Sequence, residues 1–509
     1  IIPAGQLLAS RADEATKSGI LNKGTINIQG QESTGMFAKD SSEMTNNGTI
    51  NLVDSTSADK PNIGMFTEDK STVIHNNKDI IGGNNTYGIY GKTVNLGATG
   101  QIKVGDNSVG IFSNGEYAAG STPTIDLAAN SKIEVGKNEA VGVFTTGENQ
   151  VIKSEGDMKI GDGSYGFVIR GKGTKLFTHN PNGVTLGNDA VFAYSADKTG
   201  NIENKTTLTS TGSKNYGLYA AGIVNNFADI NFGTGVGNVG IYSIGGGTAT
   251  NGTSTIRPTI RVSKSDTVNK LYGIGMAAGY TDDNGVTHQT GTITNYGTIK
   301  VEKDNGIGMY ATGSGSKAIN HGDIELSGKG TTGMYLDNNA IGENYGTINI
   351  VDGSNLTGVF INKGTQAANY DDQIPGGGTG VLNGKIEVKT QSPTGKTVAG
   401  IDIKAPGDGT ATIYRDGTRV TPIAVDTVTA TPKPLSVNVG TTSLDLSATD
   451  LATPSLGQAS SIGMYVDTSG VNYTNPIQGL NNLTGLKKVD LIFGTEASKY
   501  TNEKDIEVG

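Results

Sequence analysis

The sequence lacks several features that would point to common protein classes. Its 509 residues contain no cysteine, which excludes disulfide bonds and thiolate chemistry. The absence of cysteine fits a chain that crosses an oxidising compartment unfolded, and it is also compatible with a cytosolic protein. Charged residues make up only 17% and aromatic residues 6%, whereas glycine contributes 77 residues. Leucine, alanine and glutamate are too scarce for a helical protein.

Signals for nucleic acid and membrane are also missing. The net charge is −9, the pI is near 5.1, and lysine and arginine form no cluster, which argues against a nucleic-acid-binding surface. No apolar run approaches the length of a membrane span. The first five residues, Ile1 to Gly5, lack the basic and apolar regions of a signal peptide. We therefore expect a mature or excised fragment whose anchor lies outside it.

What the chain does contain is a repeat. One unit is Gly297-Thr298-Ile299-Lys300-Val301, followed after a short gap by Gly308-Met309-Tyr310. The glycine before the aliphatic–aromatic pair recurs in most cases every 22 to 27 residues or so, at Gly35, Gly64, Gly88, Gly110, Gly142, Gly166, Gly217, Gly240, Gly275, Gly308, Gly333 and Gly358, with Ala190 in the same place and weaker copies at Gly400 and Gly463. A strand-like repeat of this period predicts an all-β solenoid, because each unit is too small to bury its own apolar face.

The solenoid is predicted to have about 15 coils, each with three short strands. In the strand with the pattern Thr-Ile-x-Ile, apolar and polar residues alternate, which places Ile299 inward and Lys300 outward. A strand before it ends in Asn-x-Gly, where asparagine and glycine tolerate the left-handed backbone that a sharp corner needs. Stacked amides at this register are predicted to form a ladder along the axis, from Asn22, Asn46, Asn76, Asn226, Asn295, Asn320 and Asn344.

An aromatic row follows the repeated glycines. It consists of Phe37, Phe66, Tyr90, Phe112, Phe144, Phe192, Tyr219, Tyr242, Tyr310, Tyr335, Phe360 and Tyr465. Alternation with the inward methionines and isoleucines favours an outward direction for these rings. The sequence leaves two interpretations open: a packed ladder, or a half-exposed stripe that binds sugars or a partner strand.

Departures from the repeat divide the chain. We expect an N-terminal cap or fragment end over residues 1–20, with a short helix at 6–15, then β-helix repeats over 21–370. Residues 371–460 read as an irregular insertion with an Asp-Gly hairpin at 412–420, and residues 461–509 as terminal coils. A second small hairpin is predicted around Asn284-Gly285.

Catalytic and metal-binding patterns are weak. With no cysteine, four histidines and no Gly-x-Ser-x-Gly motif, we assign no catalytic residue, no metal ligand and no cofactor. Regular coils repeat one surface, so binding is predicted in the two insertions, which carry the tyrosines and arginines that dominate recognition surfaces. The candidate binding residues are Tyr280, Asp282, Asp283 and His288 in one insertion, and Tyr414, Arg415 and Arg419 in the other.

The reiterated Asn-x-Gly-Thr-Ile and Gly-Ile-Gly-Met-Tyr units resemble the passenger repeats of large fusobacterial type V autotransporter adhesins. The resemblance covers most of the chain and extends to the stretch from Gly463 to Asn502. It implies a right-handed parallel β-helix that is exported across the outer membrane to the bacterial surface, where it binds a protein or glycan receptor on other bacteria or host cells. The β-barrel of that family is absent, so this fragment itself is not expected to insert into a membrane. The alternative function is a β-helix enzyme acting on polysaccharides.

Overall fold

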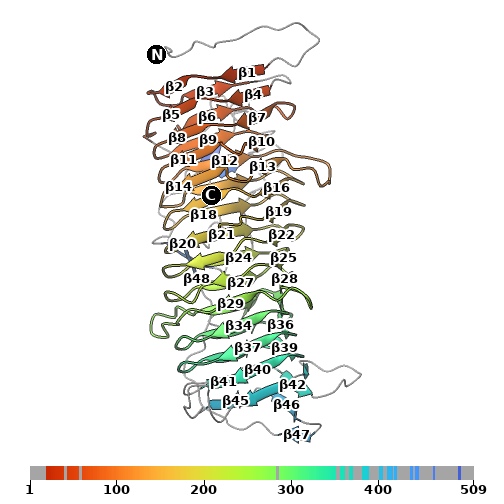
Figure 1. The fold of residues 1–509 in the computed structure, drawn as a ribbon. Coiled ribbons are helices and arrows are strands. Elements are labelled where there is room, and N and C mark those ends of the chain that lie inside the picture. The colour runs from red at the N-terminus through yellow and green to blue at the C-terminus, as the bar shows by residue number, and fades with distance from the viewer. Residues whose placement is uncertain are drawn as a thin grey trace.

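The computed structural model describes residues 19–38, 43–56, 60–282 and 286–350, and beyond them only the strands named below. The expected helix at 6–15 lies outside the described residues. Within them, every regular element is a strand, and almost all strands pair in parallel with the strand one coil away. Figure 1 shows the strands stacked as rungs from β1 to β45. The predicted parallel β-helix is therefore confirmed.

The first strand of each coil belongs to a 17-stranded sheet, here the first sheet. Its strands are β1 (Gly19–Asn22), β4 (Glu43–Asn46), β7 (Val73–Asn76), β10 (Thr93–Leu96), β13 (Ile125–Leu127), β16 (Val151–Ser154), β19 (Lys175–Thr178), β22 (Asn201–Asn204), β25 (Ile223–Asn226), β28 (Gly247–Asn251), β33 (Gly291–Asn295), β36 (Lys317–Asn320), β39 (Ile341–Asn344), β42 (Gln366–Tyr370), β43 (Val381–Asn383), β46 (Thr410–Arg415) and β47 (Thr418–Val420).

The second strand of each coil belongs to a sheet in two successive parts, here the second sheet, with six and eight strands. The six are β2 (Thr25–Ile28), β5 (Thr49–Leu52), β8 (Asp79–Gly82), β11 (Gln101–Val104), β14 (Lys132–Val135) and β17 (Asp157–Ile160). The eight are β20 (Val184–Leu186), β23 (Leu208–Ser210), β26 (Ile230–Asn231), β29 (Thr259–Arg261), β34 (Thr298–Val301), β37 (Asp323–Leu326), β40 (Thr347–Ile350) and β44 (Lys385–Val388).

The third strand carries the repeated glycine and forms a 14-stranded sheet, here the third sheet, so the described coils number 14 where about 15 were predicted. Its strands are β3 (Thr34–Phe37), β6 (Asn62–Phe66), β9 (Thr86–Tyr90), β12 (Val109–Ser113), β15 (Val141–Thr145), β18 (Tyr165–Ile169), β21 (Val191–Ser195), β24 (Tyr216–Ala220), β27 (Val239–Ser243), β30 (Ile274–Ala278), β35 (Ile307–Thr312), β38 (Thr332–Asp337), β41 (Leu356–Ile361) and β45 (Gly400–Lys404).

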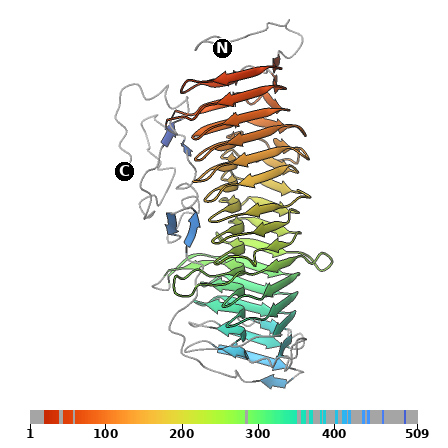
Figure 2. The same cartoon turned by 60° about the vertical axis from the view of Figure 1, so that its left-hand side comes forward.

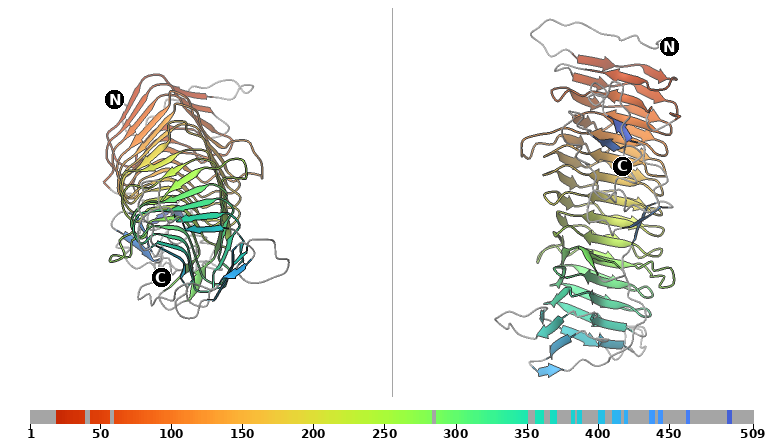
Figure 3. Two further views of the ribbon diagram at one scale, coloured as in Figure 1. Left: turned by 60° about the horizontal axis from the view of Figure 1, so that its bottom comes forward. Right: turned by 180° about the vertical axis from the view of Figure 1, so that it is seen from behind.

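Six further strands lie outside these three sheets. They form separate two-stranded sheets: β31 (Tyr280–Thr281) with β32 (Thr287–Gln289), β48 (Ser436–Val439) with β49 (Thr442–Asp445), and β50 (Ile462–Met464) with β51 (Leu491–Phe493). The coil sheets also continue past residue 370, where the sequence placed the end of the regular repeats. Figure 3 shows the stack obliquely along its axis and from behind.

One continuous core fills the inside of the coils. It contains the inward residues of all three sheets, including Ile299 and Ile348, which are both fully buried. The outward Lys300 of the same strand is half-exposed, as the alternation predicted. The right-handed course of the coil stays a prediction, favoured by the strong preference of parallel crossovers for that hand.

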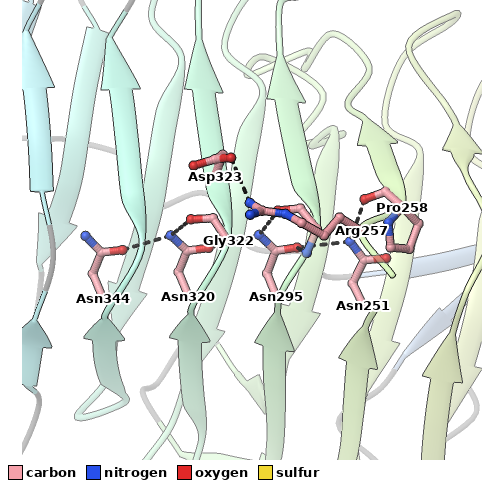
Figure 4. Close-up of polar contacts among 9 residues, drawn as sticks. Asn251, Arg257, Pro258, Asn295, Asn320, Gly322, Asp323 and Asn344 are labelled. Atoms are coloured by element: carbon pink, nitrogen blue, oxygen red, sulfur yellow. Dashed lines mark hydrogen bonds and ion pairs between the residues drawn. The ribbon is translucent and has the colours of Figure 1, made fainter. Parts of the chain in front are cut away.

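The predicted asparagine ladder is present. In the stretch from Asn204 to Asn344, each Nδ2 donates to the Oδ1 of the next asparagine over 2.7–2.9 Å. Figure 4 shows four of these amides in line, one on each first-sheet strand from β28 to β39. Asn204 and Asn251 join the members expected from sequence. Between Asn76 and Asn204 the register is occupied by Leu96, Leu127, Ser154 and Thr178.

The reason first given for the Asn-x-Gly corner is wrong. Neither the ladder asparagines nor the glycines two residues after them, such as Gly297 and Gly322, have positive φ, although Gly252, directly after Asn251, does. Asn85 and Asn107, which do have positive φ, stand at the corner before the third sheet. Glycine is required at the ladder corner by close approach instead. A Cβ on Gly322 would lie 2.0 Å from the carbonyl oxygen of Gly297 in the preceding coil.

Candidate recognition surface

The hairpin of β31 and β32 gathers three of the predicted binding residues. The Nε2 atom of His288 lies 2.9 Å from Oδ2 of Asp282, and the Tyr280 ring centroid lies 5.7 Å from that of His288. Tyr280 is only 5% exposed, so its ring packs against the third sheet rather than facing solvent. Asp283 lies outside the described residues. The hairpin thus presents an Asp–His pair, and its binding role stays a prediction.

The second predicted insertion, residues 371–460, contains the hairpin expected at 412–420. Strands β46 and β47 pair antiparallel, with Tyr414 opposite Arg419 and Arg415 opposite Thr418, as the Asp-Gly signal predicted. Placement of these three candidate side chains lies outside what the structure describes. Their backbone register nevertheless pairs Tyr414 with Arg419 in the hairpin, and Figure 1 shows β46 and β47 at the lower end of the coil stack.

An exposed ring stack was missed by the sequence interpretation. Tyr296, His321 and Tyr345 each follow a ladder asparagine, so successive coils place them in one column. The His321 ring lies 4.8 Å from each tyrosine ring, with interplanar angles of 9° and 13°. Tyr345 is 41% exposed and His321 is also exposed. The signal was an aromatic ring in the same position after the ladder asparagine in three consecutive coils.

Charges surround this ring stack. Glu343 binds Lys317 over 2.8 Å and accepts a hydrogen bond from the Tyr345 hydroxyl at 3.3 Å. Partial burial lowers the pKa of His321, and the neighbouring Glu343 acts in the opposite direction. Burial and Glu343 together raise the pKa of Tyr345. Both shifts favour the uncharged forms of the His321 and Tyr345 rings at neutral pH.

Ion pairs continue onto the neighbouring second-sheet face. Arg257 reaches Asp323 over 2.8 Å, past the strand between them (Figure 4), and Arg261 reaches Glu302 over 2.9 Å. Their side chains are 39–46% exposed, and such pairs contribute at most about 1 kcal/mol each. These pairs matter for recognition more than for stability, because they place guanidinium groups and carboxylates on the same edge of the solenoid as the aromatic rings, within a few coils.

The aromatic row bears out one of its two interpretations and corrects one register assignment. Its rings point out of the coil interior, as the alternation favoured, and from Phe112 to Phe360 they form a second buried cluster, as a packed ladder predicts. Only the first rungs, at Phe37, Phe66 and Tyr90, stay partly exposed. Phe192 is the exception, because its ring points into the coil interior. It lies in the coil core 5.6 Å from Phe167, and Tyr194 takes the outward position. The assignment of Ala190 to the glycine register was therefore wrong by two residues.

Chemistry beyond binding finds little support in the described ranges. No group of three histidine, cysteine, aspartate or glutamate side chains there could hold a metal ion. Burial raises the pKa of Glu139 to about 7, and this carboxyl group interacts electrostatically with Tyr165. No basic side chain among the described residues forms an ion pair with Glu139, and we assign it no catalytic step. Among the described residues, no helix is long and apolar enough to cross a membrane.

Stacked parallel strands, one continuous core and an amide ladder define this chain as a parallel β-helix protein. Its residues 4–80 and 92–347, more than half of the chain, match the family described as the BigA third pectate lyase-like domain. The chain belongs to this family, whose namesake BigA is a bacterial surface protein. A search of curated proteins found no match, and neither did a search of solved structures.

Proposed function

We propose that this chain is the passenger part of a cell-surface adhesin, which extends from the bacterial outer membrane and attaches the cell to other bacteria or to host cells. The observation that carries the proposal is membership in the family of a bacterial surface protein domain, combined with a stack of 14 coils. At about 4.8 Å per coil the stack spans roughly 62 Å, a shape suited to carrying a binding surface away from the cell. The repeat resemblance to autotransporter passengers supports the same function.

We propose further that the chain acts by binding and not by catalysis. The ring stack of Tyr296, His321 and Tyr345, with Arg257 and Asp323 nearby, is the best-defined exposed aromatic and charged surface of the described coils. Aromatic and arginine side chains supply most of the free energy in recognition surfaces. The hairpins at 280–289 and 410–420 remain the other candidate contacts, with either a protein or a glycan as receptor.

The test uses fluorescent beads coated with the full chain and counts their attachment to panels of bacteria and epithelial cells. We expect attachment to at least one cell type, saturable by soluble chain. The variant Y296A/H321A/Y345A should reduce it several-fold. The control K23A/N47A/N77A changes the same corner register in the first three coils and should leave attachment unchanged.

The insertion at 410–420 is tested on the same beads. Deleting these residues should preserve the β-sheet circular dichroism spectrum while weakening attachment, if Tyr414, Arg415 and Arg419 take part. Attachment to no cell type by the native chain would refute the adhesin proposal. Equal losses in the corner variant and its control would instead remove the ring stack as the site.

A further inference from the structure

The outward face of the third sheet is buried along most of its length. Its central rings are almost inaccessible: Phe144, Tyr242 and Tyr310 are 0% exposed and Tyr219 is 1% exposed. These residues belong to a cluster separate from the coil core, so the coil interior does not bury them. Outward side chains of an uncovered solenoid sheet meet solvent. The burial therefore requires a cover on the outside of this sheet.

The other two sheets show what uncovered faces look like here. Strands β34 and β36 alternate between half-exposed and buried residues, whereas every residue of β15, β24 and β27 is buried. The cover also has an end. Phe37 in β3 is 38% exposed, Phe66 and Tyr90 are half-buried, and Phe112 in the next coil is only 3% exposed. The first three rungs of the aromatic row thus lie at the cover's edge.

Four strands near the C-terminus have no place in the coil sheets. β48 pairs only with β49, and β50 only with β51, as two separate two-stranded sheets. Such small sheets are marginally stable in water unless they pack on an apolar surface. Their sequences are suited to that: β51 reads Leu-Ile-Phe, and β48 and β49 contribute Val437, Val439 and Leu444.

The position of β48 to β51 also fits packing on the outward face of the third sheet. Figure 2 shows these strands, in blue, outside the coil stack and alongside it, and the view from behind in Figure 3 shows them in front of the coils. In Figure 1 the label of β48 stands at the height of β24 and β27, the strands that carry Tyr219 and Tyr242. The buried sheet face and the unsupported small sheets therefore occur on the same part of the axis.

We propose that the outward face of the third sheet is an internal docking surface, occupied by the C-terminal stretch of this chain that carries β48 to β51. The face from β12 to β41 comprises ten strands, about 43 Å. Nearly ninety residues follow β47, and an extended chain covers about 3.3 Å per residue, so the stretch is long enough to reach every rung. This docking does not depend on the adhesin role.

The consequence is that most of the aromatic row is reserved for the chain itself. A sugar or partner strand can reach only the rungs near Phe37, Phe66 and Tyr90 unless the C-terminal stretch detaches. Burial also raises the pKa of Tyr219 and Tyr242 well above its usual value. Both effects protect the covered tyrosines from tetranitromethane, which nitrates accessible phenolate groups.

Nitration of the full chain, mapped by peptide mass spectrometry, tests the docking. Val437 and Leu444 are register partners in the β48–β49 hairpin, and Asn438 and Ser443 form the adjacent pair, on the alternate face. V437D/L444D should raise nitration of Tyr219 and Tyr242 from undetectable to within a few-fold of the exposed Tyr345. N438D/S443D introduces the same charges in the same hairpin and should leave both tyrosines protected.

Circular dichroism must show an intact solenoid in both variants, and light scattering must show monomers. Should V437D/L444D unfold, a specific protease site inserted after Val420 of the native chain replaces it: the two fragments should co-elute natively and separate in urea. Equal protection in both variants, or fragments that separate without urea, overturns the proposal. Protection that requires a dimer overturns it as well, because the cover is then a second copy.

Discussion

Removal of one ladder amide is predicted to destabilise the solenoid by more than any surface change. Asn226 is fully buried; its Nδ2 donates to Ala228 O over 2.7 Å and to Asn251 Oδ1 over 2.8 Å. Its Oδ1 accepts from Asn204 Nδ2 over 2.7 Å. Asn226→Ala deletes all three hydrogen bonds. At about 1 kcal/mol net for each bond, the predicted loss is about 3 kcal/mol.

The neighbouring residue provides the control. Asn225 stands on the same strand, on the opposite face, and is half-exposed. Asn225→Ala should therefore change stability by no more than about 0.5 kcal/mol. Both variants are compared by urea unfolding followed by circular dichroism, and by hydrogen exchange of β25 and β28, because a stacked repeat can open locally before it unfolds. Similar losses from both substitutions would refute the ladder as a stabilising device.

Two further predictions concern the core and pH. Ile299→Asp or Ile348→Asp places an unpaired charge in the continuous core and should cost more than about 4 kcal/mol in urea unfolding, whereas Lys300→Ala or Asn27→Asp on the outward faces should change little. Burial raises the pKa of Glu139 from 4.5 to about 7, so the folded state binds the proton more tightly and stability falls as pH rises through this range. Glu139→Gln should therefore be more stable than the native chain at pH 8 and equal to it at pH 4; an advantage that is the same at both pH values would contradict this reasoning.

Much of the fold could be predicted because stacking makes it periodic. The glycine spacing predicted the length of one coil, and the alternation at Ile299 and Lys300 predicted which residues face the core. The shared position of the asparagines predicted the ladder. The predicted register was wrong at Ala190. In the coil before, the usual aliphatic–aromatic pair is replaced by Phe167-Val168. In the next coil Phe192, and not Ala190, occupies the position of the repeated glycine. Local pattern alone cannot distinguish such a shift from the true repeat.

The candidate surface was less predictable. Burial of the aromatic row depends on what lies outside the third sheet, and strand alternation carries no information about that. The ring stack of Tyr296, His321 and Tyr345 arises only when three corners are superposed. Tyr280 looked like a surface residue in a loop, yet its hairpin folds the ring back onto the aromatic cluster.

The central claim, that one repeat adds one coil along a single axis, can be measured by pulsed electron resonance between spin labels. The chain has no native cysteine, so labels can be introduced at Asn51 in β5, Thr209 in β23 and Lys300 in β34. These outward second-sheet positions lie six and nine coils from the first. At about 4.8 Å per coil, the distances from position 51 should be near 29 Å and 43 Å, a difference of about 14 Å. Distances that fail to increase with the number of coils would contradict the stacked solenoid.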